Sequence, residues 1–238
     1  MIIRPLTELD EFDKCIALQR EAFGWADIDV LPRRFLVVLG NIGGLVLGAY
    51  DGDRLVGFLN SIPGIRNGMP YWHSHMLAVT RDCWNSGVGS FLKLAQRSHA
   101  LERGIRLIEW TFDPLESRNA YLNIVKLGTI VRRYYPNHYG ETTGALQRGL
   151  DSDRVIAEWW VDRPRVPVEG DIRWVVIPLD LQSLKKQSLD SARDLQKRVR
   201  EQFQKNIQDD YFVAGFERGD ESSQYVFVPG ASRVYPAD

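Results

Sequence analysis

The sequence has little of what marks several classes of protein. Two cysteines, Cys15 and Cys83, occur among 238 residues, and their spacing fits neither a disulfide framework nor a metal-binding motif. Lys and Arg number 30 against 31 Asp and Glu, so the formal net charge of −1 gives no reason to expect nucleic acid or an anionic membrane as a partner. From these absences we expect reduced thiols, a cytoplasmic location and no bound metal.

Long hydrophobic runs are also missing. The most apolar stretch, residues 35–50, is interrupted by Asn41 and four glycines, which argues against a membrane span, and no signal peptide is recognisable. The chain is nevertheless 44% hydrophobic and long enough to bury a full core. We therefore expect either one large globular domain or one domain with a smaller second one.

A strand, a glycine-bearing turn and a helix are predicted between His73 and His99. Residues 76–79 form a short apolar run typical of a buried strand, and Gly87 and Gly89 then open a segment with apolar residues at helical spacing. The predicted buried face comprises Val88, Phe91, Leu92 and Ala95, and the helix ends at Gly104. A helix that starts in a glycine turn presents unpaired N–H groups at the positive end of its dipole, and such a site binds anions, phosphate above all.

The residues around this turn resemble motif A of the GNAT superfamily of acyl-CoA N-acyltransferases. In that family a strand, a loop and a helix with the pattern Q/R-x-x-G-x-G/A cradle the pyrophosphate of coenzyme A. Gly87 and Gly89 occupy the two small-residue positions, whereas Trp84 departs from the usual Gln or Arg. The resemblance implies acetyl-CoA or another acyl-CoA as co-substrate. It assigns these residues to binding it: Leu77, Ala78, Val79, Trp84, Asn85, Ser86, Gly87, Val88, Gly89 and Ser90, with Asn119 and Asn123 from the next helix.

Two histidines are candidates for the general base that deprotonates the acceptor amine. His73 and His75 are two residues apart, so in a strand both side chains lie on one face, and the ordinary pKa of histidine suits proton transfer near neutral pH. The run H-S-H-M-L-A-V is similar to the H-x-H-x-L-A-V of arylalkylamine N-acetyltransferases, in which paired histidines relay the proton through water. His73 also falls where histone-type members carry a glutamate base. In the structural alternative, both rings only cap a sheet edge through hydrogen bonds.

The proton donor for the leaving thiolate departs from the family pattern. GNAT members usually carry N-x-x-A-x-x-x-Y-x-x-x-G-F in the next helix, and here Ile124 stands at the tyrosine position and Ser117 at the asparagine. Tyr121, almost one turn earlier, is the candidate acid, with Asn123 beside it. The alternatives are that Tyr121 is a packed helix residue, or that the thiolate leaves unassisted because its pKa is close enough to neutrality.

The predicted elements of residues 1–162 follow the GNAT order, which implies an α/β fold with a mixed sheet. We expect a GNAT acyltransferase domain over 1–162 and a small α+β extension over 163–238. The β-α-β-β order of the extension repeats the order at the start of the chain. The extension is therefore either a degenerate half-repeat or an appendage that closes the sheet or forms an oligomer contact, for example in a homodimer. Three local expectations follow from the pattern: an N-cap at Thr7, a loop over 63–70 and a helix over 116–127.

Three functions are compatible with these features. The first is transfer of an acetyl or succinyl group from acyl-CoA to the amine of a small molecule, such as an amino acid. The second is a CoA-binding module without catalysis, and the third is an acyltransferase for protein lysines or N-termini. The segments H-S-H-M-L-A-V, W-T-F-D-P-L and R-Y-Y-P-N-H-Y-G together resemble a subgroup of predicted GNAT proteins, some of which are associated with N-acylamino acid racemases. We favour the first function, because residues 136–153 suggest a covered pocket.

The expected acceptor pocket is built from the strand end at 110–114, Asn123 and the segment 132–139. In this segment the arginines are the predicted partners of a substrate carboxylate or of the CoA 3′-phosphate, and the tyrosines supply walls with polar tips. These residues are Arg132, Arg133, Tyr134, Tyr135 and Tyr139, and Arg118 and Lys126 are further candidates for the phosphate.

Overall fold

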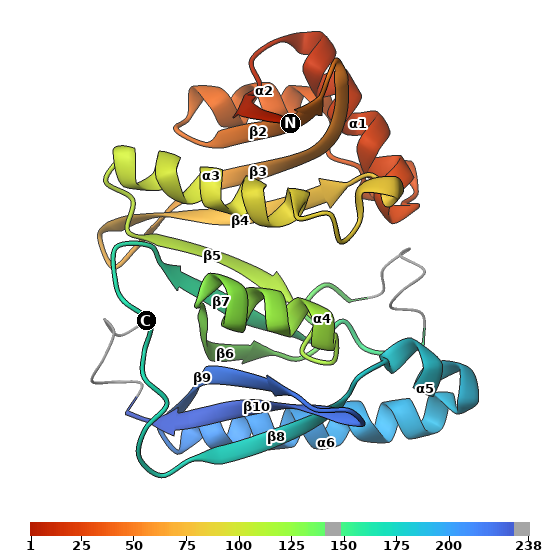
Figure 1. Ribbon diagram of the computed structural model, residues 1–238, viewed down its shortest axis with the longest axis vertical. Coiled ribbons are helices and arrows are strands. Elements are labelled where there is room, and N and C mark those ends of the chain that lie inside the picture. The colour runs from red at the N-terminus through yellow and green to blue at the C-terminus, as the bar shows by residue number, and fades with distance from the viewer. Residues whose placement is uncertain (141–148, 231–238) are drawn as a thin grey trace. The chain divides into compact units, whose positions relative to one another are not determined.

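The computed structural model describes residues 1–140 and 149–230 of the chain. Packing divides these residues into two compact units, 1–109 and 110–140 with 149–230 (Figure 1). The division falls inside strand β5, Leu107–Phe112. The expected boundary at residue 162, between a GNAT domain and an extension, concerns a different division and remains a prediction.

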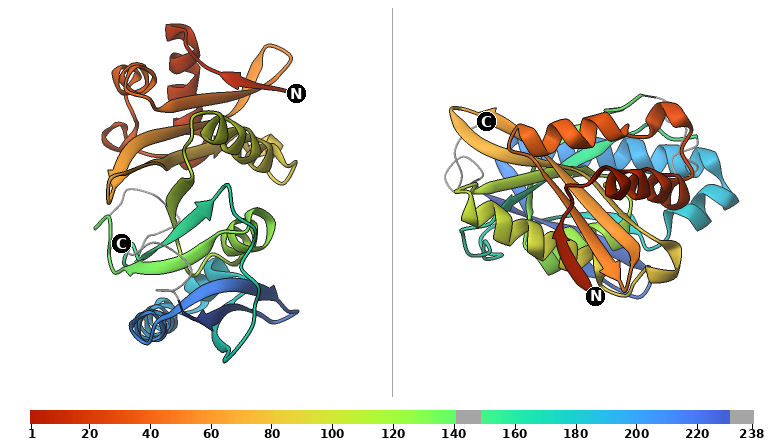
Figure 2. Two further views of the ribbon diagram at one scale, coloured as in Figure 1. Left: turned by 90° about the vertical axis from the view of Figure 1, so that its left-hand side faces the viewer. Right: turned by 90° about the horizontal axis from the view of Figure 1, so that it is seen from above.

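The first unit is a sheet of four antiparallel strands to which the start of β5 is added in parallel, in the order β1-β2-β3-β4-β5. Figure 2 shows α1 and α2 on one face of this sheet and α3 on the other. The elements before β5 are β1 (Ile2–Pro5), α1 (Leu9–Phe23), the 3₁₀ turn η1 (Asp27–Asp29), α2 (Arg33–Asn41), β2 (Leu45–Asp51), β3 (Arg54–Arg66), β4 (Met69–Val79), the 3₁₀ turn η2 (Arg81–Cys83) and α3 (Val88–Glu102).

A hydrophobic core fills the space between α1, α2 and the sheet. Phe12 and Cys15 of α1 and Leu36 of α2 pack with Phe58 and Met76 from the strands. These positions recur at helical spacing in the helices and alternate along the strands, so each element buries one face. The two cysteines are free thiols, and burial raises the pKa of Cys15 to about 12.

Helix α1 begins one residue later than predicted. Its N-cap is Glu8 and not Thr7, because the Glu11 carboxylate accepts hydrogen bonds from the Thr7 and Glu8 amides at 3.1 and 3.2 Å. Arg4 donates to the same carboxylate at 2.5 Å. An ion-paired glutamate of the first turn therefore holds the residues that lead into the helix, and the Thr7 hydroxyl donates to the Glu8 carboxylate instead of capping the helix.

The loop predicted over residues 63–70 is wrong, because most of it is strand. β3 and β4 continue as a ribbon to Arg66 and Met69, and the turn between them is Asn67-Gly68, with φ of 48° and 76°. Positive φ at both central residues is what a tight two-residue hairpin requires, and Asn-Gly supplies it. Pro63 is tolerated because β2 pairs with β3 only as far as Ser61, and Pro70 because the pairing of β4 with β5 in this unit covers Trp72 and His73, so each proline has a strand partner on one side only.

The second unit contains a sheet in the order β7-β6-β9-β10-β8. Phe203 of α6 packs against Tyr134, Tyr225 and Phe227 of this sheet, with ring centroids 4.9–5.4 Å apart. The elements after β5 are α4 (Ser117–Ala120), η3 (Tyr121–Leu127), β6 (Ile130–Tyr135), β7 (Arg154–Trp160), β8 (Arg173–Pro178), α5 (Leu181–Gln187), α6 (Leu189–Gln208), β9 (Tyr211–Arg218) and β10 (Ser222–Pro229). The predicted α/β class with a mixed sheet is confirmed.

Two expectations for this unit need correction. The helix over 116–127 is α-helical for four residues only, and η3 is a π-helix, a wider coil that is rare and often lies at functional sites. A half-repeat would place β8 beside β9, as β1 lies beside β2, but β8 pairs with β10. Strand order therefore contradicts a simple half-repeat.

Measured against the thickness of a bilayer, every helix in the described ranges is too short or too polar to span one.

Candidate active site

The predicted strand, turn and helix are present in the first unit. Gly87 is the N-cap of α3 with φ of 90°, which a residue with a Cβ rarely adopts, and it provides no side-chain cap. The first hydrogen bond of the helix is donated by the Phe91 N–H to the Gly87 carbonyl, at 3.0 Å. The N–H groups of Val88, Gly89 and Ser90 therefore have no intrahelical partner and are open to an anionic ligand.

Glycine serves a different purpose at each position near this helix. A Cβ at Gly57 of β3 would lie 3.0 Å from Val88 Cγ1 and 3.2 Å from Leu92 Cδ1, so this glycine lets α3 approach the sheet. A Cβ at Gly89 would meet only Leu77 Cδ2 at 3.5 Å, an ordinary contact. The fold thus requires glycine at residues 57 and 87, whereas the lack of a side chain at residue 89 leaves space beside the open N–H groups.

Trp84 occupies the Gln or Arg position of the family pattern, but its side chain has a different function. Its indole N–H donates to the Val79 carbonyl at 2.9 Å and so ties the loop to the end of β4.

The buried face of α3 differs from the prediction, because Phe91 is 50% exposed. The residues that α3 buries are Val88, Leu92, Lys93, Gln96 and Ala100.

A β-bulge in β4 lies at the second histidine. The register with β3 shifts between Asn60, which pairs with Met76, and Ser61, which pairs with Ser74, so His75 has no partner in that ladder. The rings of His73 and His75 are 6.2 Å apart, and His75 is 6.5 Å from the ring of Phe35 on α2. His75 keeps much of its surface exposed, yet loss of hydration beside these neighbours, together with the charge of His73, lowers its pKa below the ordinary histidine value.

Beyond the histidines, the backbone of β4 is open on one side in this unit. Its pairing with β5 here covers Trp72 and His73, whereas its pairing with β3 continues to Val79. By resemblance to GNAT enzymes, we expect the main-chain N–H groups between Leu77 and Val79 to be the donors to the oxyanion that forms during acyl transfer.

Sequence reasoning missed Glu109, a buried carboxylate beside His73. The parallel register of β4 and β5 pairs His73 with Glu109, whose Oε1 is 3.8 Å from His73 Nδ1. Glu109 is 4% exposed, and Arg66 donates to it at 2.8 Å. At 3.8 Å the carboxylate is beyond hydrogen-bond reach of Nδ1, but its charge favours the tautomer with the proton on Nδ1, which leaves Nε2 as a base. The available signal was a glutamate inside an otherwise apolar strand.

A second buried polar cluster joins α3 to the strands at the bulge. Lys93 Nζ donates to Ser74 Oγ at 2.9 Å, and Gln96 Nε2 donates to Ser61 Oγ at 2.7 Å. Both helix residues are buried, and loss of hydration lowers the pKa of Lys93 well below its ordinary value. Since Ser61 and Ser74 pair directly beside the bulge, this cluster fixes the strand segment that carries the histidines.

The remaining predicted site residues lie in the second unit. Asn119 is exposed, and Tyr121 lies on the π-helix with Lys126 Nζ and the Arg218 guanidinium 5.6 and 5.7 Å from its ring centroid. Asn123 is buried and accepts a hydrogen bond from Trp110 Nε1 at 3.3 Å. The structure thus carries the donor turn and both histidines in one unit, and the candidate acid with the two asparagines in the other.

Arg132 and Arg133 pair with a carboxylate of the protein itself. Both donate to the buried Glu158 carboxylate, at 2.8 and 3.2 Å, so each already has a carboxylate partner within the protein. In the ranges that the structure describes, no set of three or more His, Cys, Asp and Glu side chains is arranged to hold a metal ion.

Comparison with known proteins gives the family. Residues 12–123 match the model of the acetyltransferase (GNAT) family. An aminoglycoside 6′-N-acetyltransferase solved in complex with coenzyme A has a TM-score of 0.54 and 19% identity, over 70% of this chain and 100% of that one. An aminoglycoside 6′-acetyltransferase type Ii has a TM-score of 0.53 and 22% identity over the same shares. The ribosomal-protein-S18-alanine N-acetyltransferase from Escherichia coli has a TM-score of 0.53 and 14% identity, over 71% and 99%.

No curated protein matches the sequence. At identities this low, the solved structures establish the fold. The family model covers residues 12–123, just under half of the chain, and this segment, which includes the strand–turn–helix at Gly87, carries a GNAT acetyltransferase domain.

Proposed function

We propose that this enzyme transfers an acetyl or succinyl group from the corresponding acyl-CoA to the amine of a small molecule, with amino acids among its acceptors. The observation that carries the proposal is the open N-terminus of α3 at Gly87, in the same unit as a histidine backed by a buried carboxylate. The helix end would hold the pyrophosphate of the donor, because its unpaired N–H groups and its dipole both favour negative charge.

The histidines would remove the proton from the attacking amine. His73 would accept it on Nε2, because Glu109 faces Nδ1 and stabilises the imidazolium that forms. The lowered pKa of His75 keeps that ring neutral near pH 7, so it would relay the proton through water. The N–H groups between Leu77 and Val79 would stabilise the oxyanion of the tetrahedral intermediate until the thiolate leaves.

Tyr121 remains the candidate donor of a proton to that thiolate. Its position between Lys126 and Arg218 would hold the phenol ring in place, and both cations would stabilise negative charge near its oxygen. The usual tyrosine position is occupied by Ile124, which is buried and has no proton to give. A thiolate is a good leaving group, so this step makes the smallest demand on the protein.

A thiol-release assay tests the proposal. The protein is incubated with acetyl-CoA or succinyl-CoA and with separate pools of amino acids, simple amines and lysine peptides, and free CoA thiol is measured. We expect release with a small-molecule pool. Release with the lysine peptides alone would identify a protein acyltransferase, and CoA binding without release from any pool would identify a non-catalytic module.

A further inference from the structure

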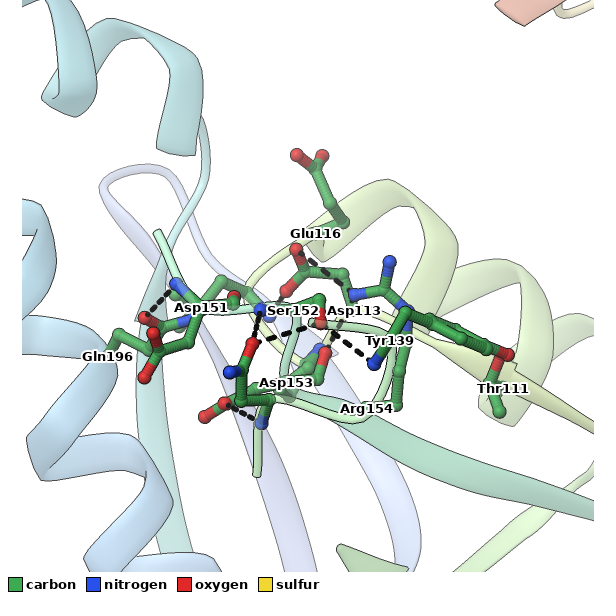
Figure 3. A network of polar contacts seen from close by, with 12 residues as sticks. Thr111, Asp113, Glu116, Tyr139, Asp151, Ser152, Asp153, Arg154 and Gln196 are labelled. Atoms are coloured by element: carbon green, nitrogen blue, oxygen red, sulfur yellow. Dashed lines mark hydrogen bonds and ion pairs between the residues drawn. The ribbon is translucent and has the colours of Figure 1, made fainter. Parts of the chain in front are cut away.

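A charged pair lies at the end of β5 in the second unit, outside the residues assigned so far. Figure 3 shows Asp113, Arg154 and Tyr139 gathered there. Arg154 Nη1 is 3.9 Å from Asp113 Oδ2, and the guanidinium carbon is 5.4 Å from the centroid of the Tyr139 ring. The Tyr139 hydroxyl is 2.8 Å from Thr111 Oγ1, which fixes the ring against the strand.

The pair stands on a rigid support. Asp153, which precedes Arg154, is fully buried and accepts hydrogen bonds from Arg200 of α6 at 2.8 Å and from the Asn137 amide at 2.9 Å. The Tyr139 amide donates to Ser152 Oγ at 2.9 Å (Figure 3). Strand β7 and the turn after β6 are therefore held in place, and with them the side chains of Arg154 and Tyr139.

This pair differs from the other ion pairs of its unit. Arg132–Glu158, Arg200–Asp153 and Arg173–Asp209 are closed at 2.6–2.8 Å. The separation of 3.9 Å between Arg154 and Asp113 is too long for a hydrogen bond. The contacts of Arg154 within the described part of the chain engage one nitrogen, Nη1, which donates to the Asp153 carbonyl at 2.7 Å. Most of its five N–H donors thus remain for a ligand.

Asp113 likewise keeps one oxygen for a ligand. Oδ1 accepts the Leu115 amide at 2.9 Å, while Oδ2 faces Arg154. Loss of hydration raises the pKa of Asp113 to about 6, even though that hydrogen bond and the charge of Arg154 oppose the shift. The side chains of Asp113 and Arg154 are 18% and 12% exposed, so both are mostly shielded from water but reachable. A ligand with charged groups of its own would replace the hydration that the charges of Asp113 and Arg154 have lost.

We propose that Asp113 and Arg154 form the subsite that recognises the acceptor, and that the acceptor carries a carboxylate near its amine. Arg154 donates to the carboxylate through the N–H groups at the edge of its planar guanidinium, and Asp113 accepts hydrogen bonds from the amino group. The inference rests on the proposed function and narrows its acceptor to the amino-acid class. A polycationic acceptor is disfavoured, because Arg154 would repel it. Acylation turns the amino group into a neutral amide, which weakens the contact with Asp113 and favours release of the product.

The test compares matched acceptors and matched variants. Thiol release from acetyl-CoA and from succinyl-CoA is measured with each common amino acid and with its α-amide, which lacks the carboxylate. We expect the KM of the amides to exceed that of the amino acids by about 10- to 100-fold, since hydrogen bonds to charged groups are the strong ones. Arg154→Gln should raise the KM of the amino acid by a similar factor, leave the KM of the acyl-CoA unchanged, and remove the preference over the amide. Arg154→Lys should restore part of the loss.

Two controls separate recognition from folding. Arg20→Gln removes an equal charge from an exposed ion pair with Asp27 in the first unit and should leave all constants unchanged. Thermal unfolding of the Arg154 variants checks that they fold, and calorimetry with the amino acids measures binding without turnover. Equal KM for amino acids and amides, an unchanged KM in Arg154→Gln, or no binding of any amino acid would overturn the inference. If the inference fails in one of these ways, thiol release with simple amines or lysine peptides would still demonstrate the proposed acyltransferase activity.

Discussion

Lys93 allows a physical prediction that needs no ligand. The residue is 3% exposed on the buried face of α3, and its pKa in the folded protein is well below the ordinary value of 10.5 because burial removes its hydration. Between the lowered pKa and 10.5, the unfolded chain holds a proton on this lysine that the folded protein does not hold. The free energy of unfolding must therefore rise with pH across that window, by up to about 1.4 kcal/mol per pH unit.

Lys93→Met isolates this contribution, because methionine keeps a flexible apolar stem of similar length without the amine. We expect the wild type to gain stability relative to the variant as the pH rises from 7 to 10, because the unfolded chain still holds a proton on this lysine that the folded protein does not hold. Urea unfolding followed by circular dichroism at pH 7, 8, 9 and 10 measures the difference. Lys197→Met, which removes an exposed lysine of α6, should show none of this dependence. A wild-type minus Lys93→Met difference that is flat with pH would show that Lys93 stays protonated when folded, and would refute the reasoning.

Three further predictions concern the enzyme. Gly87→Asp should weaken CoA binding roughly a hundredfold, because a like charge at about 5 Å and an effective dielectric constant of about 20 costs about 3 kcal/mol. Calorimetry should show no such loss of CoA affinity for Gly52→Asp, which strains a positive-φ turn elsewhere. If both variants lose the same affinity, backbone strain and not charge at the binding site explains the effect. Glu109→Gln should lower kcat by on the order of tenfold with the KM for acyl-CoA unchanged, because the tautomer of His73 is no longer fixed; unchanged kcat would remove Glu109 from the mechanism. Tyr121→Phe should lower kcat by no more than about tenfold, because a thiolate leaves readily, and a far larger loss would make the phenol an obligatory acid.

Local chemistry explains which features could be predicted from the sequence. The helix start at Gly87 was predicted because a few adjacent residues specify it, with glycine at a positive φ. The hairpin at Asp51-Gly52-Asp53 is specified equally locally, with Gly52 at a positive φ between β2 and β3. Asn67-Gly68 carries the same signal. It was overlooked because the flanking prolines suggested a loop, whereas each proline lies where its strand is paired on one side only in this unit.

Contacts between distant segments explain what could not be predicted. Glu109 becomes significant only through the parallel register that places it beside His73, and no local pattern specifies that register. From the sequence, Arg132 and Arg133 were candidate ligands for a carboxylate or phosphate, but Glu158 on the neighbouring strand β7 forms ion pairs with both. The bulge at His75 similarly depends on how β4 aligns with β3, so strand periodicity could place the two histidines on one face but could not reveal the bulge.

The central claim is that a histidine of β4 removes the amine proton during acyl transfer. Its most direct test is the pH profile of kcat/KM for the wild type and for the double variant His73→Ala/His75→Ala, with CoA affinity measured alongside. Because a base acts in its deprotonated form, kcat/KM of the wild type should rise with pH as the imidazoles lose their protons, and the lowered pKa of His75 extends the rise to the acid side of 6.5. The double variant should bind CoA normally, lose on the order of a hundredfold or more in kcat/KM and lack that rise. Near-normal turnover with an unchanged profile would contradict the account and assign both histidines to structure.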